Sequence, residues 1–428
     1  MRKVLMVIAI LYALVRVPVH LATLAGIIPT GSADWAGQDL ALNLEAARRL
    51  AARQDLYWVG PLPTPDVYHY SPLYAAACDP ASRLPFPVVA VAHSLLTLAS
   101  GVALYLLWRQ LFKRWQMARP LAMLEALLPL WLIYGAFYGD LSFLNVYTIL
   151  CLLASLLIYA VVEERLPLAV AVAWVILQVK PHWAFALGVP LLIGRWRFAL
   201  RLWAWTLSAY LGTALAWMLL AGWDYGLAQY RDYASFLLGM TDNFFWAGAE
   251  PSLGYNHSLL QIAYHSFGVS PAVRVVVTVV KVILELPLIV LGVRSMVRRW
   301  NAPAVDRAAG VEMAWLLYLA AFLWLDVIWE ITLGIVVFTW LAAELPVRRE
   351  YHVATWLFVL YALQDVWMVA MYAAVGDRLM EGYFWLDPAT HIPVVMLALL
   401  GLVGGFLAIE LTRPKLAPSG RHNLGETP

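Results

Sequence analysis

The sequence is poor in charged residues. Asp, Glu, Lys and Arg make up 13% of its 428 residues, and the formal net charge is only +2. The basic residues are scattered and never form a block, so the electrostatic pattern of nucleic-acid binding is missing. So little charge, together with long apolar stretches, also excludes an ordinary soluble domain.

Cysteine is nearly absent as well. We expect Cys78 near the outer membrane face and Cys151 inside a span, so we predict neither a disulfide nor a cysteine metal site. The sequence also lacks a P-loop, a glycine-rich dinucleotide motif, an HExxH motif and a recognisable nucleophile motif. A soluble nucleotide donor is therefore not supported. We predict no cofactor and no metal site, although a requirement for a divalent metal stays open.

Apolar residues dominate what is present. They account for 63% of the chain, and the mean hydropathy is +0.73. The 21 Trp and 21 Tyr are typical of the aromatic belts at membrane interfaces. We predict an all-α polytopic membrane protein with about twelve transmembrane or membrane-embedded helices. They fall near residues 4–28, 86–112, 118–138, 141–162, 167–179, 181–194, 201–221, 271–293, 310–325, 330–346, 351–375 and 391–411.

The distribution of Lys and Arg predicts the topology. Most of these residues fall in alternate connecting segments, which the positive-inside rule places in the cytoplasm. We therefore expect a multi-pass protein of the plasma membrane with both termini cytoplasmic. The outer loops 29–85, 222–270 and 376–390 carry most of the remaining polar residues, so any active site should lie on the outer face. The chain forms one transmembrane domain, 1–412, followed by a disordered cytoplasmic tail, 413–428.

The first long polar stretch, "GQDLALNLEAARRLAARQDLYW", begins at Gly37. Its pattern predicts an amphipathic helix lying flat on the membrane surface, from about Asp39 to Arg53. The apolar face holds Leu40, Leu44, Ala47 and Ala51, and the opposite face holds Glu45, Arg49 and Arg53. Asp39 stands at the start of this helix. Its carboxylate either caps the free backbone amides there or takes part in chemistry.

The segment "QVKPHW" places Lys180 and His182 at the apex of a short apolar hairpin. Pro181 favours an extended residue before it, so we expect Lys180 to be presented from a helix break. An interfacial lysine commonly extends toward lipid headgroups. A lone cation facing the same side as several acids is also suited to holding a phosphate.

Other polar residues gather on the outer side and are candidates for binding a substrate. They come from the loop before the second span, from the outer end of the next hairpin, from the large outer loop and from a pair of acids at a span boundary. Aromatic-belt placement, helix capping and interfacial solvation are the simpler explanations for them. The residues are His69, Tyr70, Asp140, Asn145, Asn256, His257 and Glu330, with Asp326 four residues before Glu330.

Several ionisable residues fall inside the predicted spans. Arg16 and His20, and likewise Lys281 and Glu285, are four residues apart and so share a helix face. Glu125 also lies within a span. Pairing within or between helices is the simpler role for such residues, and a path for protons or ions is the alternative.

The order of these segments resembles the GT-C membrane glycosyltransferases, and in particular glycosyltransferase family 87, which uses polyprenyl-phosphate mannose. The similarity rests on "GQDLALNLEAARRLAARQDLYW", "YHYSPLYAAACDPASRLP", "QVKPHWAFALGVPLLIGRWR", "YNHSLLQIAYH" and "WLDVIWEITLGIVV", found in the order of the family. The chain departs from the family pattern at Leu40, where an aromatic residue is common, and at Asp140, where glutamine is common.

The resemblance implies a GT-C-like fold and roles for the residues. Asp39 would be the catalytic general base, with Asp34 as the alternative acid in the same loop. Lys180, His182 and His257 would stabilise the phosphate of the donor. The remaining polar candidates, His69, Tyr70, Asp140, Asn145, Asn256 and Glu330, would contact the sugar or the acceptor.

The sequence thus predicts an outer-face glycosyltransferase. It would move a sugar, by resemblance mannose, from a polyprenyl-phosphate donor to a hydroxyl of a lipid or glycan acceptor, and its other partners would be membrane lipids. The alternative is a multi-span transporter or a flippase for lipid-linked sugars, for which many spans and buried ion pairs are normal. A third hypothesis is an inactive, lipid-binding relative.

Overall fold

The computed structural model describes residues 2–27, 37–57, 67–243, 253–254, 256–300, 306–345, 352–375 and 391–412, and these contain helices but no strand. The first half of the chain holds α1 (Arg2–Leu24), α2 (Gln38–Ala51), α3 (Pro72–Ser82), α4 (Phe86–Arg114), α5 (Ala118–Ala126), α6 (Leu128–Leu132), α7 (Gly135–Phe143), α8 (Tyr147–Val162), α9 (Leu166–Val179), the 3-10 helix η1 (Pro181–Gly188) and α10 (Val189–Leu192). The second half holds α11 (Trp196–Ala221), α12 (Trp223–Asn243), α13 (Leu259–Phe267), α14 (Pro271–Arg299), α15 (Arg307–Trp324), α16 (Gly334–Glu344), α17 (His352–Ala362), α18 (Gln364–Val375) and α21 (Val394–Thr412). The all-α prediction is confirmed.

Fewer helices are long enough to cross a membrane than the sequence predicted. Six described helices have the length and composition of a span, and the number rises to eight if two bent pairs each count as one. The shorter apolar helices α8, α9 and α16 do not reach this length. The predicted span 181–194 is instead the short η1 followed by one turn of α10. Hydropathy overcounts here because a helix buried by other helices is as apolar as one that faces lipid.

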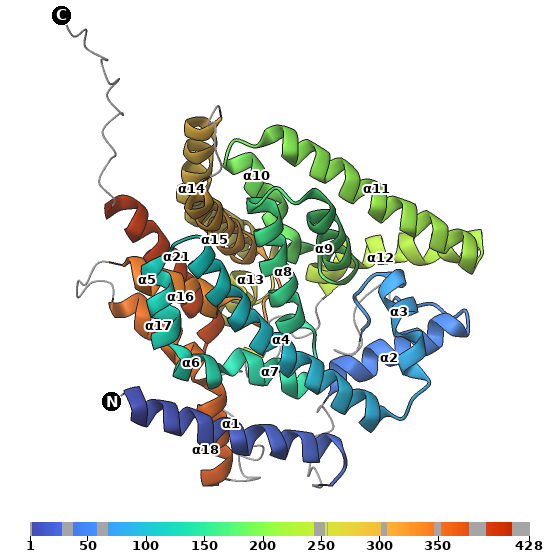
Figure 1. Ribbon diagram of the computed structural model, residues 1–428. Coiled ribbons are helices and arrows are strands. Elements are labelled where there is room, and N and C mark those ends of the chain that lie inside the picture. Colours follow the sequence, from blue (N-terminus) through green and yellow to red (C-terminus); the bar gives the residue numbers. More distant parts are fainter. Residues whose placement is uncertain are drawn as a thin grey trace, which may run out of the picture.

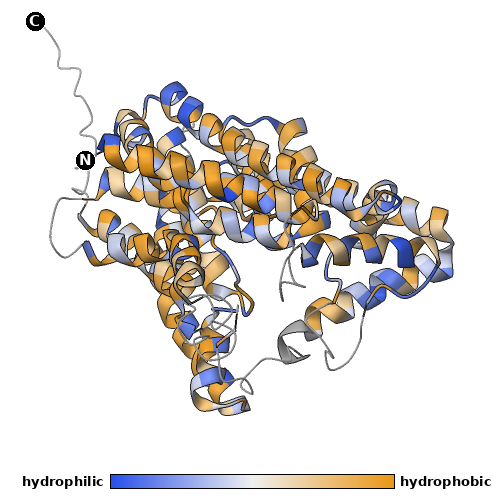
Figure 2. Ribbon diagram, turned by 90° about the horizontal axis from the view of Figure 1, so that it is seen from below, coloured by the Kyte–Doolittle hydropathy of each residue, from blue (hydrophilic) through white to orange (hydrophobic). Residues whose placement is uncertain are grey.

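The helix α8 occupies the centre of the bundle. It packs against α4, α9, η1 and α15, and α4, α9 and α15 lie around it in Figure 1. Trp108, Trp183 and Trp315 fill the spaces between these helices and are fully buried. Hydrophobic residues predominate along most of the helices, as the colours of Figure 2 show. Large exposed apolar side chains on α1, α4, α11 and α14 fit contact with membrane lipids.

The predicted amphipathic helix is present as α2. Leu40, Leu44 and Ala47 are buried, and Glu45 is exposed, as the pattern indicated, but Ala51 is exposed rather than buried. The helix packs against α3, beside the start of α4 (Figure 1). The apolar face of α2 is therefore covered by protein.

Gly37 fixes where α2 begins. Its φ of +76° lies in the left-handed region, and a Cβ there would stand 3.0 Å from Cδ1 of Leu144. Its amide donates to the carbonyl of Ser142 at the end of α7. Glycine is required because a side chain would be both strained and crowded. This contact ties the start of α2 to the end of α7.

The charged residues within the spans pair between helices, not within them. Arg16 of α1 forms an ion pair of 3.1 Å with Asp365 of α18 instead of meeting His20. Lys281 of α14 pairs with Asp326, and Glu285 keeps one buried oxygen without a hydrogen bond. The sequence left pairing within a helix and pairing between helices open, and the structure shows partners outside the residues' own helices. Both partners lie more than 40 residues away in the sequence.

Candidate functional site

Lys180 is presented from a break between two helices, as Pro181 predicted. The helix α9 ends at Val179, and Lys180 takes an extended conformation with φ −138° and ψ 95°. Its side chain is 6% exposed. The ammonium nitrogen lies 3.9 Å from the ring centroid of Tyr147, 5.5 Å from that of Tyr70 and 5.6 Å from that of Trp329. Three aromatic faces therefore surround this cation.

Three aromatic rings surround the ammonium group of Lys180, and no described residue forms a hydrogen bond or an ion pair with it. Burial lowers the pKa of Lys180 to about 8, while the negative charges of Asp39 and Asp140 oppose this fall. The lysine therefore stays mostly protonated at neutral pH. A buried cation with this environment is suited to an anionic ligand, because a charge in a dry site needs a partner.

A cavity of about 230 Å³ opens beside Lys180. Its wall comes from the loop before α3, the start of α8, the turn between α9 and η1, one side chain of α12 and the segment between α15 and α16. The lining residues are His69, Tyr147, Val179, Lys180, Pro181, His182, Leu237, Phe322, Leu325, Asp326, Val327, Ile328, Trp329 and Glu330. Four of the predicted site residues, His69, Lys180, His182 and Glu330, thus share one cavity.

Glu330 supplies a carboxylate to this cavity. One oxygen accepts from the hydroxyl of Tyr361, and the other accepts from Nε2 of Gln364 at 3.2 Å. Burial raises the pKa of Glu330 to about 7, against the two hydrogen bonds. A Cβ on Gly139 would stand 3.0 Å from Oε1 of Glu330, so α7 approaches the carboxylate closely. This acid can exchange a proton near neutral pH.

The two histidines of the cavity are neutral at pH 7. The ring of His69 lies 4.3 Å from that of Tyr70, and its Nδ1 is 3.1 Å from the carbonyl of Val67. The ring of His182 lies 5.6 Å from that of Phe322. Burial lowers the pKa of each to about 3, and the charge of Lys180 adds to the fall. They can donate hydrogen bonds to a ligand, but Lys180 supplies the positive charge.

Asp39 lies in the first turn of α2 and not at its cap, because the helix begins at Gln38 and Gly37 holds the cap position. The N-cap interpretation of Asp39 is therefore wrong. Nδ2 of Asn145 donates to Oδ2 of Asp39 at 2.5 Å, and Oδ1 of Asn145 accepts from the hydroxyl of Tyr70 at 3.3 Å. Asp39 does not line the cavity, and this chain of contacts joins it to the ring beside Lys180.

Asp140 holds the start of α8. Its side chain is 1% exposed, and its two oxygens accept from the backbone amides of Tyr147 and Thr148 at 2.9 and 2.8 Å. These bonds satisfy two of the amides left open at a helix start. Because Tyr147 carries the ring nearest to Lys180, Asp140 positions the site from behind. Its predicted contact with a substrate stays a prediction.

Asn256 and His257 support the cavity wall without lining it. Oδ1 of Asn256 accepts from the amide of Ile328 at 3.0 Å, and its Nδ2 donates to the carbonyl of Asp326 at 3.0 Å. The amide of His257 donates to the carbonyl of Ile328, and its Nδ1 accepts from the amide of Val395. The structure does not bring His257 into the cavity with Lys180, so its predicted phosphate contact has no support from the geometry.

Sequence reasoning missed two aromatic residues of the site, Trp329 and Tyr147. Trp329 stands directly before Glu330, and Tyr147 stands two residues after Asn145. The abundance of aromatics hid both among candidates for interfacial belts. Asp34 and the tail 413–428 lie outside the described residues. Within the part of the chain that the structure describes, no three or more His, Cys, Asp or Glu side chains are grouped to hold a metal ion.

No protein-family model matches the chain, and neither a curated protein nor a solved structure matches it. The resemblance of its segments to glycosyltransferase family 87 therefore stays a prediction.

Proposed function

We propose that the protein is a membrane glycosyltransferase that takes a sugar from a polyprenyl-phosphate donor. The observation that carries the proposal is Lys180, a buried cation enclosed by three aromatic rings at the wall of a cavity. A phosphodiester carries one negative charge and suits a single ammonium group. The aromatic rings suit the apolar faces of a sugar or of an isoprenoid.

The remaining lining residues fit the needs of such a donor. Neutral His69 and His182 can donate hydrogen bonds to phosphate oxygens, which gain charge as the leaving group departs. Glu330 can accept hydrogen bonds from sugar hydroxyls. The cavity also lies among apolar helices, three of which are broken or shorter than a span, and such breaks in membrane proteins commonly line a binding site.

The proposed reaction is a single displacement at the anomeric carbon. The oxygen of an acceptor hydroxyl attacks this carbon while the bond from the carbon to the phosphate oxygen breaks, and polyprenyl phosphate departs with the electron pair. Asp39 accepts the proton of the attacking hydroxyl. An unperturbed Asp has a pKa of about 3.9, so its effect depends on position. The hydrogen bond from Asn145 fixes that position at the start of α2.

The proposal further names mannose as the sugar, a lipid or glycan as the acceptor, and the outer face of the plasma membrane as the location. They rest on the resemblance of the sequence segments and on the distribution of basic residues. The spans support a multi-pass membrane protein that contacts lipids, without an orientation.

Purified protein incubated with radiolabelled polyprenyl-phosphate mannose and a membrane lipid extract tests the proposal. Wild type should form a labelled product, and Asp39→Asn should lose it while its melting temperature stays the same. Arg231→Gln on the exposed face of α12 is a matched control that should keep full activity. Labelled donor carried across vesicles without a new glycosidic bond would favour the transporter or flippase. No product with any acceptor or metal would overturn the enzyme proposal.

A further inference from the structure

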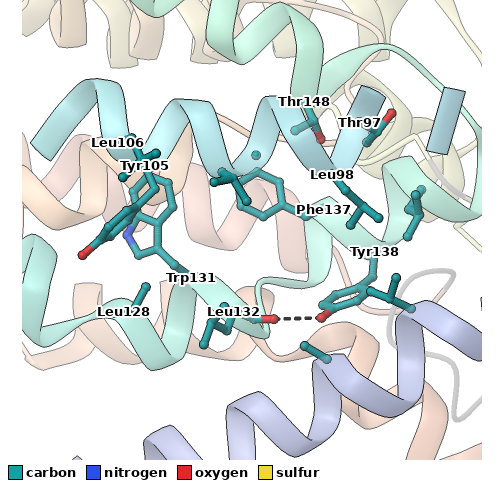
Figure 3. A pocket seen from close by; sticks show the side chains of 15 residues that line it. Thr97, Leu98, Tyr105, Leu106, Leu128, Trp131, Leu132, Phe137, Tyr138 and Thr148 are labelled. Carbon is teal, nitrogen blue, oxygen red and sulfur yellow. Dashed lines mark hydrogen bonds between the residues drawn. The ribbon is translucent and has the colours of Figure 1, made fainter. Parts of the chain in front are cut away.

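A second cavity, of about 290 Å³, lies between α1, α4, α6 and α7, away from Lys180. Aliphatic and aromatic side chains line it, together with two threonines, and several are labelled in Figure 3. The lining residues are Ala13, Val17, Thr97, Leu98, Gly101, Val102, Tyr105, Leu106, Leu128, Trp131, Leu132, Phe137, Tyr138, Leu141 and Thr148. None of them lines the cavity beside Lys180.

This second cavity opens toward lipid. Val102 and Leu106 line it and are nevertheless 62% and 53% exposed. Both lie on α4, which has the length and composition of a membrane span, and α1 beside it also does. The medium at the opening is therefore hydrocarbon, and a chain of lipid is the material that can fill an apolar space there.

One end of the cavity is basic. Figure 3 shows Tyr105 and Leu106 at one end and Thr97 at the other. Arg109 follows Tyr105 by four residues and so continues the same face of α4. Arg109 pairs with Glu125 at 3.0 Å, and Arg2 at the start of α1 donates to the backbone carbonyl of the same residue. Two arginines and one acid thus leave a net positive charge beside the cavity, and both arginines are exposed.

We infer that this second cavity binds one acyl chain of an anionic phospholipid, whose headgroup lies beside Arg2 and Arg109. The chain would run along α4 from Leu106 toward Thr97, a length of about 13 Å. Moving a chain from bilayer to cavity gains no hydrophobic energy, so selectivity comes from packing and from the charge of the headgroup. The inference is independent of the proposed sugar transfer.

The cavity also touches the wall of the proposed active site. Phe137, Tyr138 and Leu141 of α7 line the second cavity, while Gly139 of the same helix lies close to the carboxylate of Glu330. Thr148 lines the second cavity next to Tyr147, whose ring faces Lys180. An acyl chain in the second cavity therefore packs against α7 and the start of α8, the elements that contact Glu330 and Lys180.

Photo-crosslinking of the full-length protein in nanodiscs tests the inference. The probe is phosphatidylglycerol with a photoactivatable group on one acyl chain, at trace amount in phosphatidylcholine, and labelled peptides are mapped by mass spectrometry. Labels should concentrate on lining residues of α1, α4 and α7. A phosphatidylcholine probe with the same chain should label them less. Equal labelling by both probes, or labels spread evenly along α11, would overturn the inference.

Two variants separate the chain from the headgroup. Gly101→Leu fills the cavity and should reduce labelling about tenfold, since the chain loses its packing contacts. Gly212→Leu on α11, where no atom stands within 4 Å of an added Cβ, should change nothing. Arg109→Gln should lower the preference for phosphatidylglycerol about fivefold. Ala13→Leu, which fills the cavity from α1, replaces Gly101→Leu if that variant does not fold.

A third probe, a photoactivatable polyprenyl phosphate, distinguishes the lipid source. If it labels the cavity and phosphatidylglycerol does not, the occupant is the donor chain and the inference is wrong. If Gly101→Leu leaves phosphatidylglycerol labelling unchanged, the inference is also wrong. Because the readout is labelling, a failure to transfer sugar would leave this result standing and would count only against the proposed function.

Discussion

Two buried lysines of this protein have opposite environments. Lys281 is 4% exposed, and its ammonium group donates to the carbonyls of Trp324 and Leu325 and pairs with Asp326. Lys180 is 6% exposed, and aromatic rings take the place of those oxygens. Protein oxygens bind the first ammonium group directly, whereas Asp39 and Asp140 act on the second through their charges, which leaves its donors open to a ligand. Burial alone therefore does not identify a functional lysine, but the chemistry of its neighbours does.

Lys281 also serves the site indirectly. It holds the carbonyls at the end of α15, where the segment that carries Trp329 and Glu330 begins. From the other side, Asn256 bonds the carbonyl of Asp326 and the amide of Ile328. The segment between α15 and α16 is therefore held on one side by Lys281 of α14 and on the other by Asn256. Replacing Lys281 should lower stability more than it lowers the rate of sugar transfer.

The largest expected effect is that of Lys180→Met. It should reduce sugar transfer by about 100-fold or more, since one donor to developing charge is lost. Thermal unfolding should show unchanged or higher stability, because the change removes a buried charge that no carboxylate of the described residues contacts directly. Rates of labelled product and melting temperatures measure the two effects. A Lys180→Met protein that transfers sugar normally but unfolds at a lower temperature would show that Lys180 serves stability and not ligand binding.

Lys281→Met should behave in the opposite way. It removes the donor to the carbonyls of Trp324 and Leu325 and the ion-pair partner of Asp326, which should cost about 2 kcal/mol of unfolding free energy. Denaturant unfolding in detergent measures this loss, and transfer assayed well below the melting temperature should be much less affected than in Lys180→Met. Equal stability of Lys281→Met and wild type would show that the ion pair is dispensable.

The pH dependence of donor binding sharpens the comparison further. With a pKa of about 8, Lys180 is charged below pH 8 and neutral above it, whereas a phosphodiester keeps one negative charge throughout. Binding should therefore weaken about tenfold for each pH unit above 8. Glu330, with a pKa of about 7, is already ionised there. A titration of labelled donor measures this, and Lys180→Arg should remove the pH dependence.

The smallest expected effect is that of Gly139→Ala. Its Cβ would stand 3.0 Å from Oε1 of Glu330, so the carboxylate must shift by a few tenths of an ångström. We expect a decrease in kcat of about threefold. Gly404→Ala on α21, with nothing within 4 Å, is the matched control. A Gly139→Ala enzyme as active as this control would show that the position of Glu330 is not critical.

The sequence predicted what depends on neighbouring residues. The pattern of α2 was visible because amphipathic faces repeat every turn, and Pro181 gave the extended Lys180 because its ring restricts the residue before it. The overestimate of spans has an equally local cause. Nearly every residue of α16 is buried within the protein, and its apolar sequence cannot tell that environment from lipid.

The pairing of charges was not predictable from the sequence. Arg16 and Asp365 are separated by 349 residues, and only the packing of α1 beside α18 and α7 brings them together. The same is true of Asp39 and Asn145, which lie 106 residues apart. Local spacing could show only that His20 shares a helix face with Arg16, and Glu285 with Lys281. Contacts between distant segments depend on tertiary structure that no short pattern encodes.

The left-handed backbone at Gly37 provides a test for relatives that needs no biochemistry. Any chain that begins α2 against α7 in the same way must keep a glycine two residues before its acid, since a Cβ would meet Leu144 and Phe86. A proline after the lysine favours the extended backbone of Lys180, but this preference is weaker than the requirement for glycine at position 37. A homology search anchored on these two backbone constraints, rather than on the polar residues, should separate chains that share this site from those that share only its hydropathy.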